Sequence, residues 1–290
     1  MQIFSNGWDW SGLIWAKWVW LAAPGRKRLE FRHSMATQRS ISANLGVYFY
    51  GGAAIFLGIL GLVSRDFSTP WQNVGANVPL RVPLAFVTAV IELAGGISLL
   101  VPRTARAGAL ILTIVYSVFT LLWLPGALVN LGSYDAIGSV FENLSLVAAG
   151  LVLCATFWGA GSFMARRRHL FVLLFGICPI SFGIVHIIDM PGLLNWIPGW
   201  LLLPKMFLAY VTTLGFFAAA IAILTGILAP LAARLLTAEI VGFELLVWIP
   251  MLSRDPHKHF NWAGNAICIA IAGAAWVVSD SISAAAKNQN

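Results

Sequence analysis

Long runs of apolar residues, separated by short polar or glycine- and proline-containing stretches, recur along the chain from residue 43 onwards. Eight of these runs have the length of about 20 residues that an α-helix needs to cross the hydrocarbon core of a bilayer. They cover residues 43–63, 83–101, 105–126, 138–159, 170–188, 205–228, 230–251 and 263–282. The pattern therefore predicts eight transmembrane helices, and hence an all-α polytopic membrane protein.

The composition supports a membrane protein and excludes other classes. The 290 residues are 59% hydrophobic and 10% charged, and the mean hydropathy is +0.84. A soluble domain has about 25% charged residues, so a water-soluble enzyme, a disordered chain and a coiled coil are excluded. The net charge is +7, but the basic residues cluster beside the apolar runs, where they set topology and contact anionic lipids. We therefore expect the lipid bilayer, and no nucleic acid, as a partner.

The distribution of Lys and Arg predicts the orientation in the membrane. With the N-terminus in the cytoplasm, thirteen of the 18 basic residues fall on the inner side and five on the outer side. Because cytoplasmic segments carry the excess of basic residues, this count predicts a multi-pass inner-membrane protein with both termini in the cytoplasm.

Residues 1–38 precede the first span, and they are rich in tryptophan and followed closely by basic residues. Five tryptophans lie in a stretch too short to cross the membrane: Trp8, Trp10, Trp15, Trp18 and Trp20. Tryptophan prefers the headgroup region, so we interpret this arm as an interfacial anchor on the cytoplasmic leaflet. A docking arm for a soluble partner is the alternative.

The chain repeats itself after 125 residues. This shift places Gly58 on Gly183, Trp71 on Trp196, and Trp123 on Trp248. The two four-span units cover residues 39–160 and 170–284, joined by the basic linker 161–169, and residues 285–290 form a tail. Four is an even number, so the halves share one orientation and form tandem parallel repeats. The short connections predict that each half is an antiparallel four-helix bundle.

Six ionisable residues lie within or at the end of the predicted spans, where a charge is costly and commonly marks a function. These candidates for ligand contact or proton handling are Glu92, Glu142, His186, Asp189, Glu239 and Glu244. The spacing of His186 and Asp189 predicts one common helix face. Glu239 and Glu244 are about 140° apart around a helix, so we expect them to point to different places.

A structural role is the alternative for these groups. Each acid could be held by a backbone donor or a basic residue and only tie helices together; the candidate bases are Arg65, Arg81, Lys205 and Arg254. His186 alone could equally be a packed polar residue. Trp71, Trp196 and Trp200 indicate interface aromatics, or alternatively a lid over an amphipathic ligand such as a quinone.

No metal site is predicted. Cys154, Cys178 and Cys268 lie in apolar runs without a Cys-x-x-Cys spacing, which indicates small lipid-compatible side chains. His257 and His259 could hold a metal beside an aspartate, but we interpret their segment as a solvated polar loop.

Several of these residues resemble the DoxX-like family of membrane proteins. The run Glu92-Leu93-Ala94-Gly95-Gly96 with Arg103 and Arg106 resembles its second-span signature. In the second half, Gly183-Ile184-Val185-His186 resembles the first-helix glycine and histidine, and Trp196-Ile197-Pro198 resembles the outer loop. The four-span unit has the usual size of the family and occurs here twice. Each copy departs from the pattern: Gly61 replaces the histidine of the first, and Phe217 the acid of the second.

The resemblance implies a function, since the family includes a subunit of a thiosulfate:quinone oxidoreductase. By this analogy the chain is a membrane subunit or accessory of a quinone-linked redox system, not catalytic alone, with an oxidoreductase subunit as partner. Glu92 and Glu142 would contact the quinone or its protons. One alternative is a carrier or binding protein for a small hydrophobic or weakly acidic molecule, with Glu239, Glu244 and His186 lining its site. A second is a structural scaffold for a soluble partner.

Overall fold

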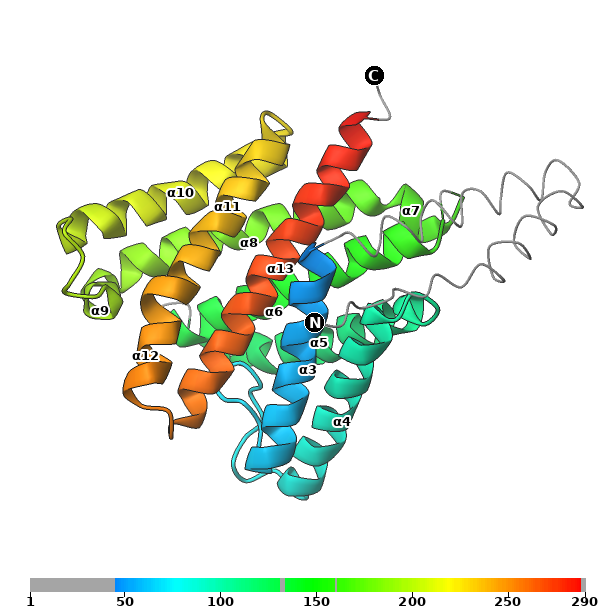
Figure 1. The fold of residues 1–290 in the computed structure, drawn as a ribbon, viewed down its shortest axis with the longest axis horizontal. Coiled ribbons are helices and arrows are strands. Elements are labelled where there is room, and N and C mark those ends of the chain that lie inside the picture. Colours follow the sequence, from blue (N-terminus) through cyan, green and yellow to red (C-terminus); the bar gives the residue numbers. More distant parts are fainter. Residues whose placement is uncertain (1–44, 131–133, 160, 288–290) are drawn as a thin grey trace, which may run out of the picture. The chain divides into compact units, whose positions relative to one another are not determined.

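A computed structural model describes residues 45–130, 134–159 and 161–287 (Figure 1). This part of the chain is all-α, and it contains eight helical segments long and apolar enough to cross a membrane. The spans are α3 (Leu45–Ser64), α4 (Arg81–Leu100), α5 (Ala105–Val129), α6 (Tyr134–Phe157), α8 (Arg168–Ile188), α10 (Lys205–Thr225), α11 (Ala229–Phe243) with its continuation, and α13 (His259–Lys287). The polytopic all-α class is thus confirmed. The predicted arm at 1–38 lies outside the described residues.

Four shorter helical segments complete the described chain. They are α7 (Phe163–Arg166), α9 (Met190–Trp196), the π-helical turn η1 (Glu244–Trp248) and α12 (Ile249–Arg254), of which the last two prolong α11. The largest difference from the predicted spans is at α13, which extends beyond the predicted 263–282 at both ends. Its first turn is stabilised because the Asn261 amide donates to the carbonyl oxygens of Met251 and Asp255.

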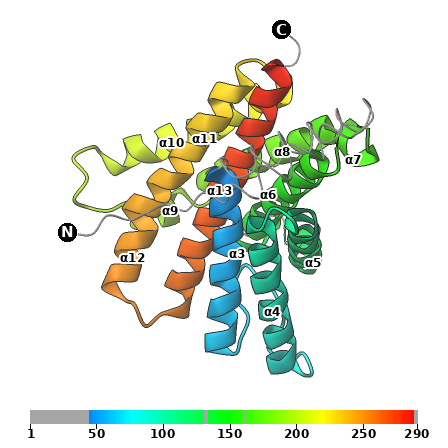
Figure 2. The same cartoon turned by 45° about the vertical axis from the view of Figure 1, so that its right-hand side comes forward.

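The two halves repeat the same packing. Within the first half α3 packs on α4, α4 on α5, and α5 on α6; within the second, α8 packs on α10, α10 on α11, and α11 on α13. The fourth helix of each half, however, packs along the first helix of the other half: α13 along α3, and α6 along α8 (Figures 1 and 2). Contrary to the prediction, the halves therefore do not form two separate bundles.

Helices α6 and α13 form the centre of the described structure. They also pack on each other, and 72% of each span is buried, against 28–50% in the other six. A hydrogen bond from the Tyr50 hydroxyl to the Leu146 carbonyl oxygen, 2.9 Å long, ties α3 to α6. Helices thus pack closely across the boundary between the halves as well as within each half.

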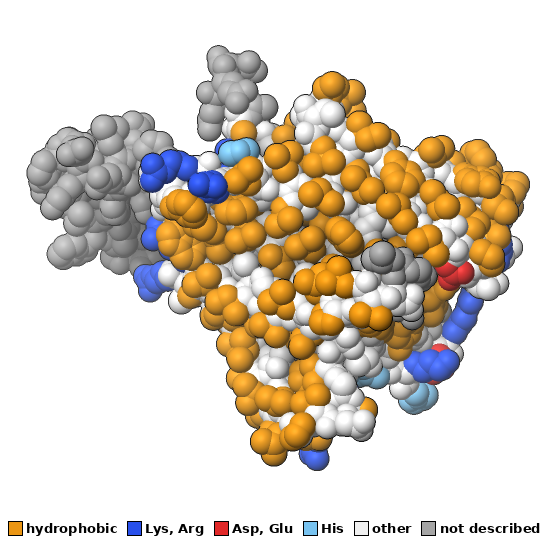
Figure 3. All heavy atoms as spheres, turned by 180° about the vertical axis from the view of Figure 1, so that it is seen from behind, with side chains coloured by type: hydrophobic (Ala, Val, Ile, Leu, Met, Phe, Trp, Pro, Cys, Tyr) orange, Lys and Arg blue, Asp and Glu red, His pale blue; other side chains and the backbone are white. Residues whose placement is uncertain are grey.

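The outward surface suits a bilayer. Large apolar side chains on several spans are more than half exposed, among them Leu121, Leu214, Ile221 and Leu231. Figure 3 shows such side chains covering most of one face, with Lys and Arg at its edges. The spans alternate in direction, so the connections 65–80, 189–204 and 255–258 share one end, which we call the long-loop end. The connections 101–104, 158–167 and 226–228 share the other, the short-loop end.

Candidate functional site

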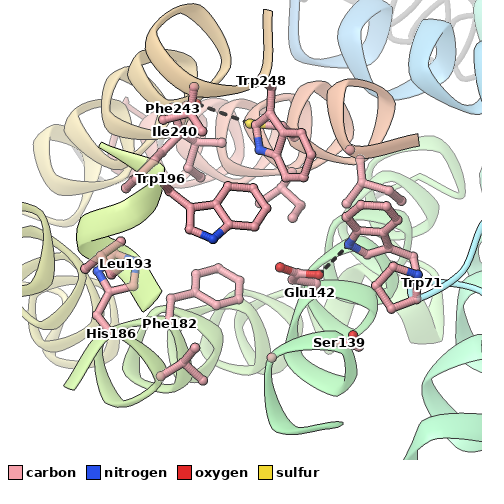
Figure 4. A pocket seen from close by; sticks show the side chains of 18 of the residues that line it. Trp71, Ser139, Glu142, Phe182, His186, Leu193, Trp196, Ile240, Phe243 and Trp248 are labelled. Carbon is pink, nitrogen blue, oxygen red and sulfur yellow. Dashed lines mark hydrogen bonds between the residues drawn. The ribbon is translucent and has the colours of Figure 1, made fainter. Parts of the chain in front are cut away.

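A cavity of about 220 Å³ lies between the two halves, toward the long-loop end (Figure 4). Its walls come from α6 in the first half, from α8 to α13 in the second, and from the connection between α3 and α4. The cavity therefore depends on both repeats, as a ligand site between parallel repeats would.

Seven of the 20 residues that line the cavity are phenylalanine or tryptophan. They are Trp71, Phe182, Trp196, Phe216, Phe243, Trp248 and Phe260. Trp71 and Trp196, which the 125-residue shift superposes, approach Trp248 with ring centroids 5.8 and 5.3 Å away. Trp71 also stacks on Phe260 at 5.4 Å. Repeat-related tryptophans of the two halves thus meet at one site, with flat apolar surfaces suited to a ring.

Glu142 supplies an acceptor to this cavity from α6. The indole Nε1 of Trp71 donates to Glu142 Oε2 at 2.6 Å, and Figure 4 shows the carboxylate pointing into the space between the tryptophans. Ser139, almost one turn earlier on α6, also lines the cavity. A hydrogen bond of this length fixes the Glu142 carboxyl group, so the oxygen that accepts from Trp71 has a defined direction.

His186 supplies the second acceptor, from α8. Its Nδ1 lies 3.3 Å from the hydroxyl oxygen of Thr213, and that hydroxyl donates its hydrogen to the Ala209 carbonyl oxygen at 2.7 Å. Because a hydroxyl has one hydrogen, Thr213 accepts here and His186 Nδ1 donates. In the neutral ring the other nitrogen, Nε2, is then an acceptor, and it has no hydrogen-bond partner within the described chain.

The π-helical turn η1 shapes the part of the cavity wall that Val247 and Trp248 form. Pro250 has no N–H to donate to the carbonyl one α-turn earlier, and the helix widens at Glu244–Trp248, with the Ile249 amide bonded to the Glu244 carbonyl oxygen. The turn directs Val247 and Trp248 to the cavity. The Glu244 carboxyl is buried beside the Cys268 thiol, behind the wall that this cysteine lines.

Four of the six sequence candidates do not line the cavity. Glu92 is buried in the first half and bonded by Gln72. Glu239 packs against Gly215 of α10, whereas Glu244 faces α13, so these two acids point to different helices as predicted. Asp189 caps α9 by accepting from the Gly192 amide at 3.0 Å. Since α8 ends at Ile188, the predicted common face of Asp189 and His186 is not formed.

The candidate bases do not hold the buried acid of the first half. Arg81 pairs with Asp66 at 2.8 Å, and Lys205 donates to the Leu194 carbonyl oxygen at 3.1 Å. Within the described residues the hydrogen bonds of the Glu92 carboxyl come from the amide of Gln72, 3.0 Å from each oxygen. The partner of Glu92 is therefore a neutral amide, and this hydrogen bond connects α4 to the loop that precedes it.

Sequence reasoning assigned no functional role to several cavity residues: Ser139, Phe260, Gly264 and Cys268. The superposition of Trp71 on Trp196 was the available signal, since it marks equivalent places in both outer loops. His259, assigned to a polar loop, instead lies with Nε2 3.2 Å from the Ser68 hydroxyl. Comparison of the chain with protein-family models, curated proteins and solved structures found no match.

Proposed function

We propose that this protein binds a quinol ring in the cavity between its halves and serves as a membrane subunit or accessory of a quinone-linked redox system. One observation carries the proposal: Glu142, which accepts a hydrogen bond from Trp71, and His186, whose Nδ1 bonds to Thr213, line one cavity together with seven aromatic residues. A quinol has two hydroxyl donors on one flat ring, so its chemistry complements both acceptors and the walls. The resemblance to DoxX-like proteins points in the same direction.

The dimensions and position of the cavity agree with this ligand. An apolar cavity of about 150 Å³ binds benzene, so about 220 Å³ accommodates a substituted six-membered ring. The ring would lie between spans, which leaves its hydrocarbon tail within the bilayer. Aromatic side chains such as Trp196 and Trp248 are typical of this depth near the membrane surface.

The two acceptors also suit the protons of the reaction. Oxidation of a quinol to a quinone releases two protons and two electrons. In this proposal Glu142 and His186 accept the protons from the two hydroxyls, and the electrons go to an oxidoreductase partner, which we propose supplies the redox centre. In this scheme the chain binds and deprotonates the quinol but does not complete the oxidation alone.

The substitution Glu142→Gln tests the proposed acceptor. Glutamine keeps an oxygen that can accept from Trp71 Nε1, but its amide nitrogen puts a donor in place of one carboxyl oxygen. We expect the affinity for decylubiquinol to fall by about 10- to 100-fold, because two donors then meet. The affinity for oxidised decylubiquinone, an acceptor, should fall much less. Both are measured by titration of the purified protein in mild detergent.

The control is Glu239→Gln, which changes a half-buried acid that lies outside the cavity. It should leave both affinities within about twofold of the wild type, because a substitution that shares no contacts with the ligand site has little effect on that site. If Glu142→Gln binds decylubiquinol and decylubiquinone with the same affinities as the wild type does, the proposed ligand is wrong. The absence of quinone from lipids extracted with the protein and examined by mass spectrometry would contradict it as well.

We also propose that the protein lies in the inner membrane with its short-loop end in the cytoplasm. The short-loop end carries Arg103, Arg106, Arg166, Arg167, Arg168 and Arg234. Basic residues prefer the cytoplasmic side. In a background with Cys154, Cys178 and Cys268 replaced by alanine, Lys258→Cys should react with an impermeant maleimide in intact cells, whereas Arg167→Cys should react only after permeabilisation. The reverse pattern would contradict this topology.

A further inference from the structure

The connection between α3 and α4 passes between the helices instead of over them. Within residues 66–74, four side chains are buried to 6% exposure or less: Phe67, Ser68, Trp71 and Gln72. We call residues 66–74 the inserted segment. Two of its buried side chains are polar, so they need partners inside the protein.

The ends of the inserted segment are held by one residue of α4. Arg81 forms an ion pair with Asp66 at 2.8 Å, and its guanidinium lies over the Phe67 ring, 5.4 Å from the centroid. The same guanidinium donates to the carbonyl oxygens of Val74 and Gly75. Arg81 thus holds the two ends of the segment close together. The residues between them supply the side chains that enter the protein interior.

The two middle residues each donate to a different intramembrane acid. Trp71 donates from Nε1 to Glu142 on α6, at the cavity. Gln72 donates from Nε2 to both oxygens of Glu92 on α4, at 3.0 Å each. These two acids thus share one dipeptide as their donor, although only one of them lines the cavity.

The orientation of the Gln72 amide is determined by its other hydrogen bond. The Ser68 backbone amide donates to Gln72 Oε1 at 2.8 Å, so the NH₂ group must face Glu92. Glu92 is 1% exposed and fixed in the middle of a span, which makes it a rigid anchor for the amide. Consecutive Cα atoms are about 3.8 Å apart, so a shift of Gln72 moves Trp71 as well.

We propose that Glu92 and Gln72 are positioning residues of the cavity: by anchoring the inserted segment, they hold Trp71 against Glu142 and Trp248. The consequence for quinol binding rests on the function proposed above, whereas the positioning itself does not. Glu92, the acid of the DoxX-like signature, then acts on the ligand site through the segment and without touching the ligand.

An exchange of the two side chains tests the anchor. Gln72→Glu places two carboxyl groups face to face and removes the donor, while keeping an acceptor for the Ser68 amide. Adding Glu92→Gln restores one amide–carboxyl pair in reversed order. We expect Gln72→Glu to lower decylubiquinol affinity about tenfold, as loss of a buried hydrogen bond does, and the double variant to recover to within about threefold of wild type.

A second readout needs no quinol. Cys268 lines the cavity, so its alkylation by N-ethylmaleimide reports on the wall in a protein with Cys154 and Cys178 replaced by alanine. We expect Gln72→Glu to raise the alkylation rate several-fold and the exchange to reverse it. If Gln72→Glu does not fold, Gln72→Met, which keeps the side-chain volume, carries the same expectation for the rate.

The matched control is Asn73→Leu. Asn73 belongs to the same segment and donates to the Leu122 carbonyl oxygen at 3.3 Å, but in an exposed position away from the cavity. The alkylation rate of Cys268 in Asn73→Leu should equal that of the protein with only Cys154 and Cys178 replaced by alanine. A rate unchanged in Gln72→Glu and Gln72→Met, or one not reversed by the exchange, overturns the positioning role. If the wild type binds no quinol while the alkylation pattern holds, the proposed function fails and the positioning role stands.

Discussion

Gly58→Ala is expected to destabilise the folded protein by about 2–3 kcal/mol, because it overpacks a tight contact between helices. Gly58 is buried on α3, against α4. A Cβ there would lie 2.7 Å from both the Ala89 carbonyl oxygen and the Leu93 amide nitrogen. These are backbone atoms inside a helix, so they cannot yield unless α3 and α4 separate. Unfolding of the purified protein in a detergent titration measures the effect.

Gly52→Ala is the matched control, on the same helix. A Cβ at Gly52 would meet no atom within 4 Å. Alanine is the better helix former, so we expect stability to be unchanged or raised by at most about 1 kcal/mol. Equal effects of the two substitutions would show that close packing of α3 on α4 does not set the stability.

Gly264→Ala is expected to close the cavity from its α13 wall. A Cβ at Gly264 would overlap the six-membered ring of Trp248, so the indole must move. Trp248 also contacts Trp71 and Trp196, so its movement displaces both of the other tryptophans. We expect a loss of at least about tenfold in decylubiquinol affinity, the effect of one methyl group in a close-fitting apolar pocket.

The control for this prediction is Gly138→Ala, which also changes a glycine that lines the cavity. A Cβ at Gly138 would meet no atom within 4 Å, so the walls need not move. Its affinity should stay close to that of the wild type. A loss of the same size in both variants would mean that added volume anywhere in the cavity is harmful, and that the position of Trp248 is not the cause.

The spans could be predicted well from the sequence because the bilayer imposes a simple requirement on each of them. Every span needs about 20 apolar residues, and this requirement acts locally. The eight predicted segments are all present in the described chain. Where they differ, as at the start of α13, the cause is a tertiary bond such as that from Asn261 to the Asp255 carbonyl oxygen, which prolongs a helix into polar sequence.

The site could be predicted only in part. Glu142 and His186 were identifiable because an ionisable group in an apolar run stands out. Trp248 and Cys268 did not stand out, since aromatic and small residues are ordinary in spans. The π-helical turn at Glu244–Trp248 is also invisible in a continuous apolar run, where no polar residue marks the helical period.

The packing of the fourth helices could not be inferred from the repeat. A shift of 125 residues shows that the halves are alike, but the same likeness holds whether α6 packs on α3 or on α8. The short connections led to the prediction that each fourth helix packs within its own half. The continuous contact of α6 with α8 and of α13 with α3 lowers the free energy by joining the halves, and such long-range contacts leave no local pattern.

The exchange of fourth helices between the halves has a consequence for biosynthesis. Among the described spans a ribosome releases α3 before all the others and α13 after them, yet these two helices lie against each other in the finished protein. When α3 to α6 have entered the membrane, the side of α3 that packs on α13 still lacks this partner. Translation must reach α13 before α3 gains this neighbour, so the described spans assemble as a ring and not one half at a time.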